Sequence, residues 1–293
     1  MEDGKIRTRT VRDAAENGVD MAKRDNTEVK ELTKKLEEGV KEVFSSDKYK
    51  EYLRFLGMFH NYSFNNVMLI LMQMPDASLV AGYKTWQKLG RNVKKGEHGI
   101  RILAPCPHKR TIEVDGDDKE VCFTTFRPTS VFDVSQTEGD ELPQGFVTML
   151  SDDVDGYESL IKKLTAVSPV KVEFEEIEDS SALGFFSHTE NKIVVKSGMS
   201  QMQTVKTLVH EISHSLLHNK ENGEEKEADR RTKEVQAESV AYTVCGVLGI
   251  DTSDYSFGYI AGWSKDKDVK ELSKSMEVVR KTASKLIEDI KAA

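Results

Sequence analysis

The sequence predicts an α+β protein of two domains, and three observations lead to this prediction. Its 293 residues exceed the size of one ordinary domain. Stretches with apolar residues at helical spacing occur in both halves, and short runs typical of antiparallel strands lie between them. The turn-forming sequence at 143–145 is a natural boundary. We expect a mobile tail over 1–26, a helical domain with a small antiparallel sheet over 27–142, and a second domain over 146–293.

Composition is that of a soluble globular protein. Apolar residues make up 38% of the chain and charged residues 31%. The apolar run at 67–72 is far too short to cross a bilayer, and the polar N-terminus lacks the apolar segment of a secretory signal. The cysteines are odd in number and lack C-x-x-C spacing, which indicates free thiols: they are Cys106, Cys122 and Cys245. We therefore expect a cytoplasmic protein without a membrane partner.

The first half is expected to begin with three helices. Asn26 and Thr27 can cap a helix that continues to about residue 44, with valines and leucines along one face. A second helix is expected from 46 or 47 to about 59. The third contains the sequence VMLILMQM and ends at Pro75, because proline cannot continue a helix.

Short strands and turns are expected after these helices. Residues 80–104 predict a short strand, a short helix around 84–89, a glycine turn and a strand at 100–104. The sequences RTIEV and KEVCFTTF flank an acidic turn at 115–118 and predict a β-hairpin. The sequence SVFDVSQTEG is expected to close this sheet.

The second half is expected to begin with a helix over 155–164 and the strand VKVEFEEI. The sequences GFFSH and KIVV, joined by a turn at 189–191, predict a second hairpin. A helix is expected from near Met202, followed by a charged loop over 219–232. A helix from Glu234 and a last helix from about 269 complete the chain.

The expected helix near Met202 contains the sequence HEISH, from His210 to His214. Residues four apart lie on one face of a helix, so the two histidines face the same way, one turn apart. Two neutral imidazoles in this arrangement can bind one zinc ion. Glu211 can then take a proton from a water molecule as the water attacks a carbonyl carbon. The motif predicts a zinc-dependent peptidase, with a protein or peptide substrate that the sequence does not name.

A third zinc ligand is expected from the next helix. Catalytic zinc commonly has three protein ligands and one open position, and two histidines with one glutamate are a common set. Glu234 follows His214 by twenty residues, which is enough for a loop and a second helix packed beside the first. We expect Glu234 to be the third ligand and Glu238, one turn further along, to orient a histidine. The reverse assignment of the two glutamates stays open.

Three further side chains have two interpretations each. His218 lies one turn beyond His214, and either approaches the zinc ligands or caps the end of the helix. Tyr242 either reaches the cleft, where its hydroxyl can stabilise an oxyanion, or packs in the core, which is the more common situation. His188 in the hairpin turn is expected to be solvated rather than catalytic.

Charge is unevenly distributed along the chain. The net charge is −8, yet residues 83–110 contain eight basic residues and one acid. The basic residues are Lys84, Lys88, Arg91, Lys94, Lys95, Arg101, Lys109 and Arg110. They can neutralise phosphates, while Tyr83 and Trp86 can stack on bases, so this stretch predicts binding of single-stranded DNA. In the alternative interpretation, Trp86 belongs to the core and the charges form a solvated face.

Six short sequences, three in each half, occur together in an order that is more specific than any one of them. They are YSFNN (62–66), GYKTWQKLGRNVKKGEHGI (82–100), SVFDVSQ (130–136), HEISH, EVQAES from Glu234, and YIAGW (259–263). Together they resemble the ArdC-type antirestriction proteins of conjugative plasmids and the related LtrC-like proteins of mobile elements. The resemblance covers most of the chain from about residue 29, except 152–200. It implies an N-terminal domain that binds single-stranded DNA and a C-terminal zincin-like, gluzincin-type metallopeptidase domain, with His210, His214 and Glu234 as zinc ligands.

The resemblance also implies a biological role, the protection of incoming single-stranded DNA from restriction during transfer of a mobile element. One alternative is a regulatory zinc peptidase that cleaves a repressor or a host defence protein, with the basic stretch as a docking surface. Another is a DNA-binding protein whose zinc domain is structural or no longer catalytic. Glu211 favours an active site, because a structural zinc has no use for a general base.

Overall fold

The computed structural model of the chain describes residues 11–44, 46–114, 117–142, 156–177, 182–220, 228–250, 252, 255 and 257–293. The expected boundary at 143–145 and the middle of the expected charged loop lie outside these residues. Within the described ranges, no helix is both long and apolar enough to cross a membrane. Helices and mainly antiparallel strands alternate along the chain, which confirms the α+β class.

The first three helices pack by their apolar faces. They are α1 (Val11–Val43), α2 (Ser46–Met58) and α3 (Phe64–Gln73). Leu32, Leu36 and Val40 recur every fourth residue along α1 and are buried. Two of the expected helices, α2 and α3, are confirmed. In contrast, α1 begins sixteen residues before Thr27 and takes in residues 11–26, which were expected to belong to a tail. Little in the sequence indicated this helix, because half of these residues are Val, Asp, Asn or Gly, which have low helix propensity.

Two small sheets follow α3. Their elements are β1 (Val80–Gly82), α4 (Tyr83–Lys88), β2 (Arg91–Val93), β3 (Ile100–Val114), β4 (Asp117–Asp133), η1 (Val134–Gln136) and β5 (Thr137–Gly139). β4 lies between β1 and β3, whereas β2 pairs with β5. The sequence SVFDVSQTEG therefore does not close one sheet, because its last three residues belong to the second. Asp133 turns the chain between the sheets by capping η1 and accepting from the backbone N–H groups of Ser78 and Leu79.

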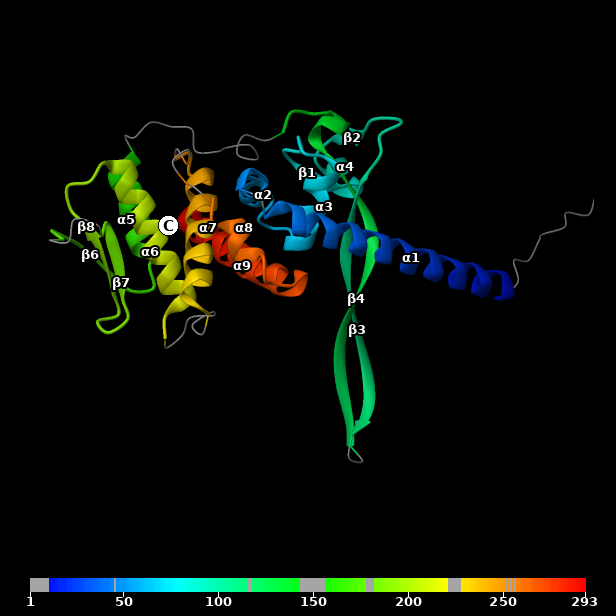
Figure 1. Cartoon of the computed structure of the whole chain (residues 1–293). Coiled ribbons are helices and arrows are strands. Elements are labelled where there is room, and N and C mark those ends of the chain that lie inside the picture. The colour runs from blue at the N-terminus through cyan, green and yellow to red at the C-terminus, as the bar shows by residue number, and fades with distance from the viewer. Residues whose placement is uncertain are drawn as a thin grey trace, which may run out of the picture.

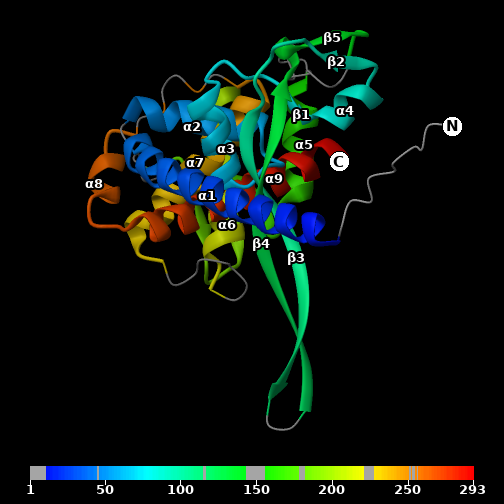
Figure 2. The ribbon, with the colours of Figure 1, turned by 90° about the vertical axis from the view of Figure 1, so that its right-hand side faces the viewer.

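A single long ribbon replaces the separate strand and hairpin expected over 100–126. β3 and β4 pair without interruption from Ile100 opposite Val131 to Val114 opposite Asp117. Pro105 interrupts nothing, because proline is tolerated at a strand edge where no N–H group is needed. The ribbon runs out beyond the body of the molecule as an arm (Figure 1), and the view from the side shows the same (Figure 2).

The second half begins with the expected helix, strand and hairpin, and the three strands form one sheet. These elements are α5 (Tyr157–Val167), β6 (Lys171–Glu175), β7 (Gly184–Ser187) and β8 (Lys192–Lys196). β8 lies in the middle, parallel to β6 and antiparallel to β7, so β7 is an edge strand. Four helices follow: α6 (Gln201–His218), α7 (Arg230–Val247), α8 (Ile260–Ser264) and α9 (Val269–Ala292). Helix α6 covers β7 and β8 on one side and packs along α7 on the other.

The core continues across the two expected domains. Helices α2 and α3 of the first half pack against α7 and α9 of the second, and most of the buried apolar side chains form one cluster that includes both halves. Polar contacts cross the same junction: the hydroxyl oxygens of Tyr49 and Ser239 lie 2.8 Å apart, and the backbone N–H of Phe64 donates to Glu277. The N-terminal helices therefore help to hold α7, the helix that carries Glu234.

Candidate metal centre

The sequence HEISH lies on α6, where the expected helix is confirmed. Ser200 caps this helix by accepting from the backbone N–H of Gln203. The side chains of Leu208, Val209 and Ile212 are buried against the sheet and α7, which sets the rotation of the helix. As a result, His210 and His214 project from the opposite face, and their Nε2 atoms lie 3.0 Å apart.

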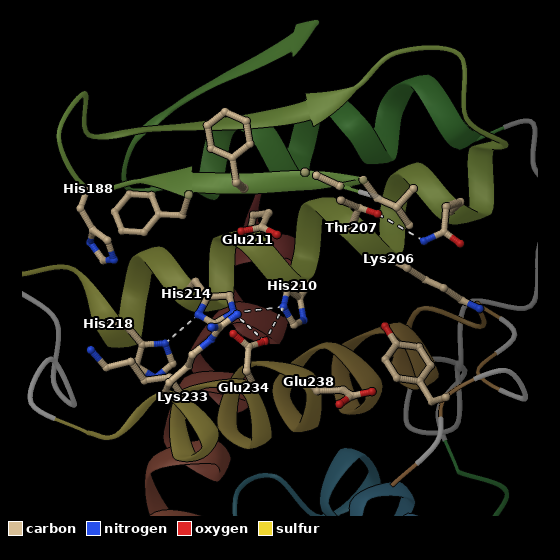
Figure 3. Close-up of a pocket in the computed structure, with 18 residues that line it drawn as sticks. His188, Lys206, Thr207, His210, Glu211, His214, His218, Lys233, Glu234 and Glu238 are labelled. Carbon is tan, nitrogen blue, oxygen red and sulfur yellow. Dashed lines mark hydrogen bonds and ion pairs between the residues drawn. The ribbon is translucent and has the colours of Figure 1, made fainter. Parts of the chain in front are cut away.

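Glu234 approaches the two histidines from α7. Its Oε2 atom is 3.7 Å from Nε2 of His210 and 3.6 Å from Nε2 of His214. Figure 3 shows the three side chains converging from the two helices on one point. A tetrahedral zinc site with ligand bonds near 2.0–2.1 Å separates its ligand atoms by roughly 3.3 Å. The donor set and the spacing therefore fit a small divalent cation. The potential ligand atoms of His210, His214 and Glu234 all lie within 4.8 Å of one another, close enough to bind the same ion.

Burial keeps two of the three histidines neutral, the form that binds metal. Burial lowers the pKa of His210 to about 4, with the neighbouring His214 adding to the effect. His218, also buried, has its pKa lowered to about 4 for the same main reason. A neutral imidazole keeps one lone pair available for a cation.

A chain of polar contacts orients His214. Nδ1 of His214 lies 2.9 Å from Nδ1 of His218, and Nε2 of His218 lies 3.0 Å from the amide oxygen of Gln236. The amide nitrogen of Gln236 donates to Ser275 on α9. Because the amide oxygen accepts, His218 donates from Nε2 and accepts at Nδ1, so His214 carries its proton on Nδ1. This leaves the Nε2 lone pair of His214 directed at Glu234, and the two interpretations of His218 resolve in favour of an approach to the ligands.

Glu211 lies between the metal-binding face and the sheet. It is buried and accepts from the backbone N–H of Phe186 in β7. Burial raises the pKa of Glu211 to about 7, with Glu234 adding to the rise and His214 opposing it. A carboxylate with this pKa exchanges protons readily near neutral pH.

Glu238 makes a different contact from the one expected. It lies one turn beyond Glu234 and accepts from the hydroxyl of Tyr259, in the YIAGW sequence, while the contact to a ligand histidine comes from His218. Burial raises the pKa of Glu238 to about 7, and the charge of Glu234 contributes. Sequence reasoning missed the roles of Gln236, Ser275 and Tyr259. For Gln236 and Ser275, the available signal was a polar side chain among apolar positions of α7 and α9. For Tyr259, it was the YIAGW sequence itself.

A cleft of about 1030 Å³ opens over these residues. His210, Glu234 and Glu238 line it from the helices, and Phe185 and Phe186 of the edge strand β7 line it from the sheet. In Figure 3 the cleft is seen with the strand above and α7 below. The open edge of β7 thus borders the candidate metal centre.

Two other candidates take clear positions. His188 is exposed, but it stands at the cleft with its ring 4.7 Å from that of Phe186, so it is not simply a solvated turn residue. Tyr242 packs its ring against those of Tyr255 and Phe257, at 5.6 Å from each, and belongs to the core.

Comparison with known proteins places the first half of the chain in a family. Residues 23–132 match the family described as the N-terminal domain of anti-restriction factor ArdC. The metal-free crystal structure of the antirestriction protein ArdC from plasmid R388 aligns over 79% of this chain and 85% of that chain, with a TM-score of 0.51 and 20% identity. Residues 23–132 therefore form an N-terminal domain of the ArdC type.

A second structure of R388 ArdC and one curated protein also match this chain. A crystal structure of R388 ArdC described as Mn(II)-bound aligns over 79% of this chain and 89% of that chain, with a TM-score of 0.48 and 18% identity. An uncharacterized Bacillus anthracis protein, pXO2-81, is 26% identical over 314 residues, which cover 90% of this chain and 51% of that protein. The chain thus spans about half the length of this curated relative.

The ArdC-type N-terminal domain contains the basic stretch, and one expected stacking residue there is wrong. Trp86 is fully buried, and its indole N–H donates to the backbone oxygen of Phe132, 2.9 Å away. A ring enclosed in this way has no face for a base, so the core interpretation of Trp86 is the correct one. Tyr83, three residues earlier on α4, is exposed.

The basic side chains of this stretch divide into two sets. Arg101 pairs with Glu28 at 2.5 Å, and Arg91 donates to Thr137 and to the backbone oxygen of Asp140, so both brace the fold. Lys94 donates to the backbone oxygen of Ser135. Lys84, Lys88 and Lys95 are exposed.

Proposed function

We propose that the second half of this chain is a zincin-like, zinc-dependent peptidase domain of the gluzincin type. The convergence of His210, His214 and Glu234 carries the proposal, because three protein ligands leave the fourth position open for water and substrate. The neutral state of His210 and the contact between His214 and His218 support it further. The edge strand β7 beside the centre suits an extended peptide, which can add to the sheet as another strand.

The catalytic roles follow from the positions of the side chains. The ion, when bound, supplies Lewis acidity and lowers the pKa of water. Glu211, held by the N–H of Phe186, takes the proton of the attacking water and delivers it to the departing amine. Phe185 and Phe186 line the cleft beside Glu211 and give it an apolar wall.

The test is Glu211→Gln, which removes the base and keeps the shape. We expect the variant to retain one equivalent of zinc by elemental analysis and to lose cleavage of an unfolded casein substrate by about 10²–10⁴-fold. A His214→Ala variant should lose both. Cleavage by the Glu211→Gln variant at the rate of the wild type would remove the peptidase proposal and leave a structural metal as the better explanation. Reconstitution with zinc and with manganese in parallel establishes which ion supports cleavage.

We also propose that the ArdC-type N-terminal domain binds single-stranded DNA and protects incoming DNA of a mobile element from restriction in the cytoplasm. The family match over residues 23–132 supports this, together with the exposed ring of Tyr83 beside exposed lysines on α4. Fluorescence anisotropy of the full chain with single-stranded and duplex oligonucleotides tests it. We expect preference for the single strand and a steep loss of affinity with salt.

The alternative is a regulatory peptidase that cleaves a repressor or a host defence protein, with the basic stretch as a docking surface. The two proposals differ in what Glu211→Gln does in cells that carry a restriction system. Protection that survives the substitution assigns the role to DNA binding, whereas protection that disappears while DNA binding stays intact assigns it to proteolysis.

A further inference from the structure

The arm formed by β3 and β4 is larger than the fold requires. Its pairs nearest the body, such as Ile100 and Val131, are buried, but the side chains at 106–109 and 121–127 lie mostly in solvent. Both views show the ribbon extending away from every helix of the body (Figures 1 and 2). A two-stranded ribbon without a covering layer is marginally stable in water, so its length indicates a role in binding.

One face of the arm combines a fixed aromatic ring with a cation. Residues paired across the ribbon share a face, which places His108 and Phe123 together, followed toward the body by Thr125 and then Arg127. The ring of His108 stacks on that of Phe123, with centroids 5.2 Å apart and planes inclined by 22°. His108 is itself held by Thr125, whose hydroxyl is 2.7 Å from Nε2. One side of the Phe123 ring therefore rests on a support, while 45% of the residue stays exposed.

The chemistry of this face fits a nucleic-acid strand. The sequences at 100–109 and 121–132 contain no acidic residue, although the whole chain has a net charge of −8. Of their three basic residues, Arg127 lies on this face, whereas the strand pairing places Arg101 and Lys109 on the opposite face. A supported aromatic ring beside an exposed arginine offers one stacking face for a base and one charge for a phosphate.

The edges of the ribbon argue against a protein strand as the occupant. Pro105 and Pro107 in β3 and Pro128 in β4 lack backbone N–H groups. An added strand needs donors along an open edge, and proline at an edge is a known device against such pairing. A ligand therefore binds to the side chains on the face of the ribbon and not to the backbone at its edge.

We propose that single-stranded DNA passes over the face of the arm that carries His108, Phe123 and Arg127, with a base stacked on Phe123. This inference rests on the proposed DNA binding by the N-terminal domain, and assigns to the arm the stacking role that the buried Trp86 cannot fill.

The arm supplies its own matched control. Phe126 is 53% exposed, similar to Phe123, but it lies on the other face of the ribbon, where it is paired with Pro105 of β3. Affinity of the full chain for a fluorescein-labelled oligo-dT strand is measured by anisotropy for the wild type, Phe123→Ala, Phe126→Ala and Arg127→Ala. We expect Phe123→Ala to weaken binding about tenfold and Phe126→Ala to change it less than about twofold. Arg127→Ala should weaken binding. It should also make the plot of log affinity against log salt concentration less steep, by the amount expected for the loss of about one phosphate contact.

Several outcomes overturn the proposal, and they differ from a failure of the DNA-binding function itself. If the wild type binds oligo-dT and Phe123→Ala binds equally well, the arm is not the platform although the domain binds DNA. Equal losses in Phe123→Ala and Phe126→Ala contradict the assignment to one face. If the wild type does not bind oligo-dT, both the proposed DNA binding and the role of the arm are wrong. Light scattering is run on the same samples, because a dimer that dissociates in Phe123→Ala would assign this face to a second copy of the chain. Circular dichroism should show unchanged unfolding for both phenylalanine variants, since neither ring is in the core.

Discussion

The candidate metal centre and the basic N-terminal surface place their candidate functional side chains in opposite ways. His210, His214 and Glu234 sit in a cleft on two packed helices, and a buried chain through His218 and Gln236 reaches a third helix. The basic surface instead carries exposed side chains such as Tyr83 on short elements. Chemistry at one point requires groups held within a fraction of an ångström, whereas a flexible polymer needs charges and rings within reach. The difference teaches that burial marks function in one region and its absence in the other.

The largest expected effect comes from removing a ligand at the metal centre. His214→Ala deletes one of three convergent atoms, so we expect metal affinity to fall by more than about 100-fold, the upper range for groups that only orient a ligand. Metal content after dialysis measures it. His188→Ala is the control, because His188 lines the same cleft from outside the ligand group. Equal loss in both variants would mean that the cleft as a whole, and not three atoms, binds the ion.

The comparison between buried and exposed aromatic residues can be tested on α4. Trp86→Ala leaves a large cavity and an unsatisfied backbone oxygen at Phe132, so we expect the free energy of unfolding to fall by about 3–5 kcal/mol. Tyr83→Ala should lower it by less than about 1 kcal/mol and weaken binding of single-stranded DNA instead. Urea unfolding and anisotropy separate the two effects. A stable Trp86→Ala variant with weakened DNA binding would reverse the two roles.

A smaller effect is expected from the residue that supports His218. Gln236→Leu keeps similar volume but removes the acceptor that fixes the His218 tautomer, so metal affinity should fall about 10–100-fold. Competition with a chelating dye measures the affinity. Gln203→Leu changes a glutamine in the same cleft that contacts Thr207, and should leave the affinity unchanged. If the two variants bind metal with the same affinity, the contacts from Gln236 through His218 to His214 do not orient the metal ligand.

The smallest expected effect concerns the turn between the two sheets. Burial alone would raise the pKa of Asp133, but hydrogen bonds from Ser135, Leu79 and Ser78 outweigh it and hold the pKa below its usual value. The ionised form therefore stabilises the fold above the unfolded pKa of about 3.9, and this contribution is lost as the pH falls through the lower folded value.

Asp133→Asn should accordingly lower the free energy of unfolding by about 1–2 kcal/mol near neutral pH. The difference from the wild type should shrink as the pH falls below about 4, where the aspartate also becomes neutral. Urea unfolding of both proteins, measured near neutral pH and again below a pH of about 4, checks this difference. A difference that does not depend on pH would show that the shape of the turn matters and the charge does not.

Local patterns predicted much of the fold and the centre of the site. The helices α2, α3, α6 and α7 follow from apolar periodicity, because each buries one face. The pair of histidines follows from their spacing within one helix. Glu234 required only that the chain turn between two helices, and the distance along the sequence allowed it.

Contacts between distant residues could not be predicted in this way. The burial of Trp86 depends on Phe132, which lies 46 residues away, and the length of the arm depends on pairing between β3 and β4 through proline positions that look like strand ends. Glu238 faces Tyr259 and not a histidine, because α8 packs against α7.

By itself, the sequence determined which residues can bind a metal ion, since a helix places His210 and His214 together whatever surrounds it. The tertiary structure decided which partners prepare them: His218 instead of Glu238 beside His214, and Gln236 and Ser275 behind it. The physical reason is the separation along the sequence between the residues that interact. Spacing along one helix is set by backbone hydrogen bonds four residues apart, whereas the tautomer of a histidine or the exposure of a tryptophan is set by side chains that only packing brings within 3 Å.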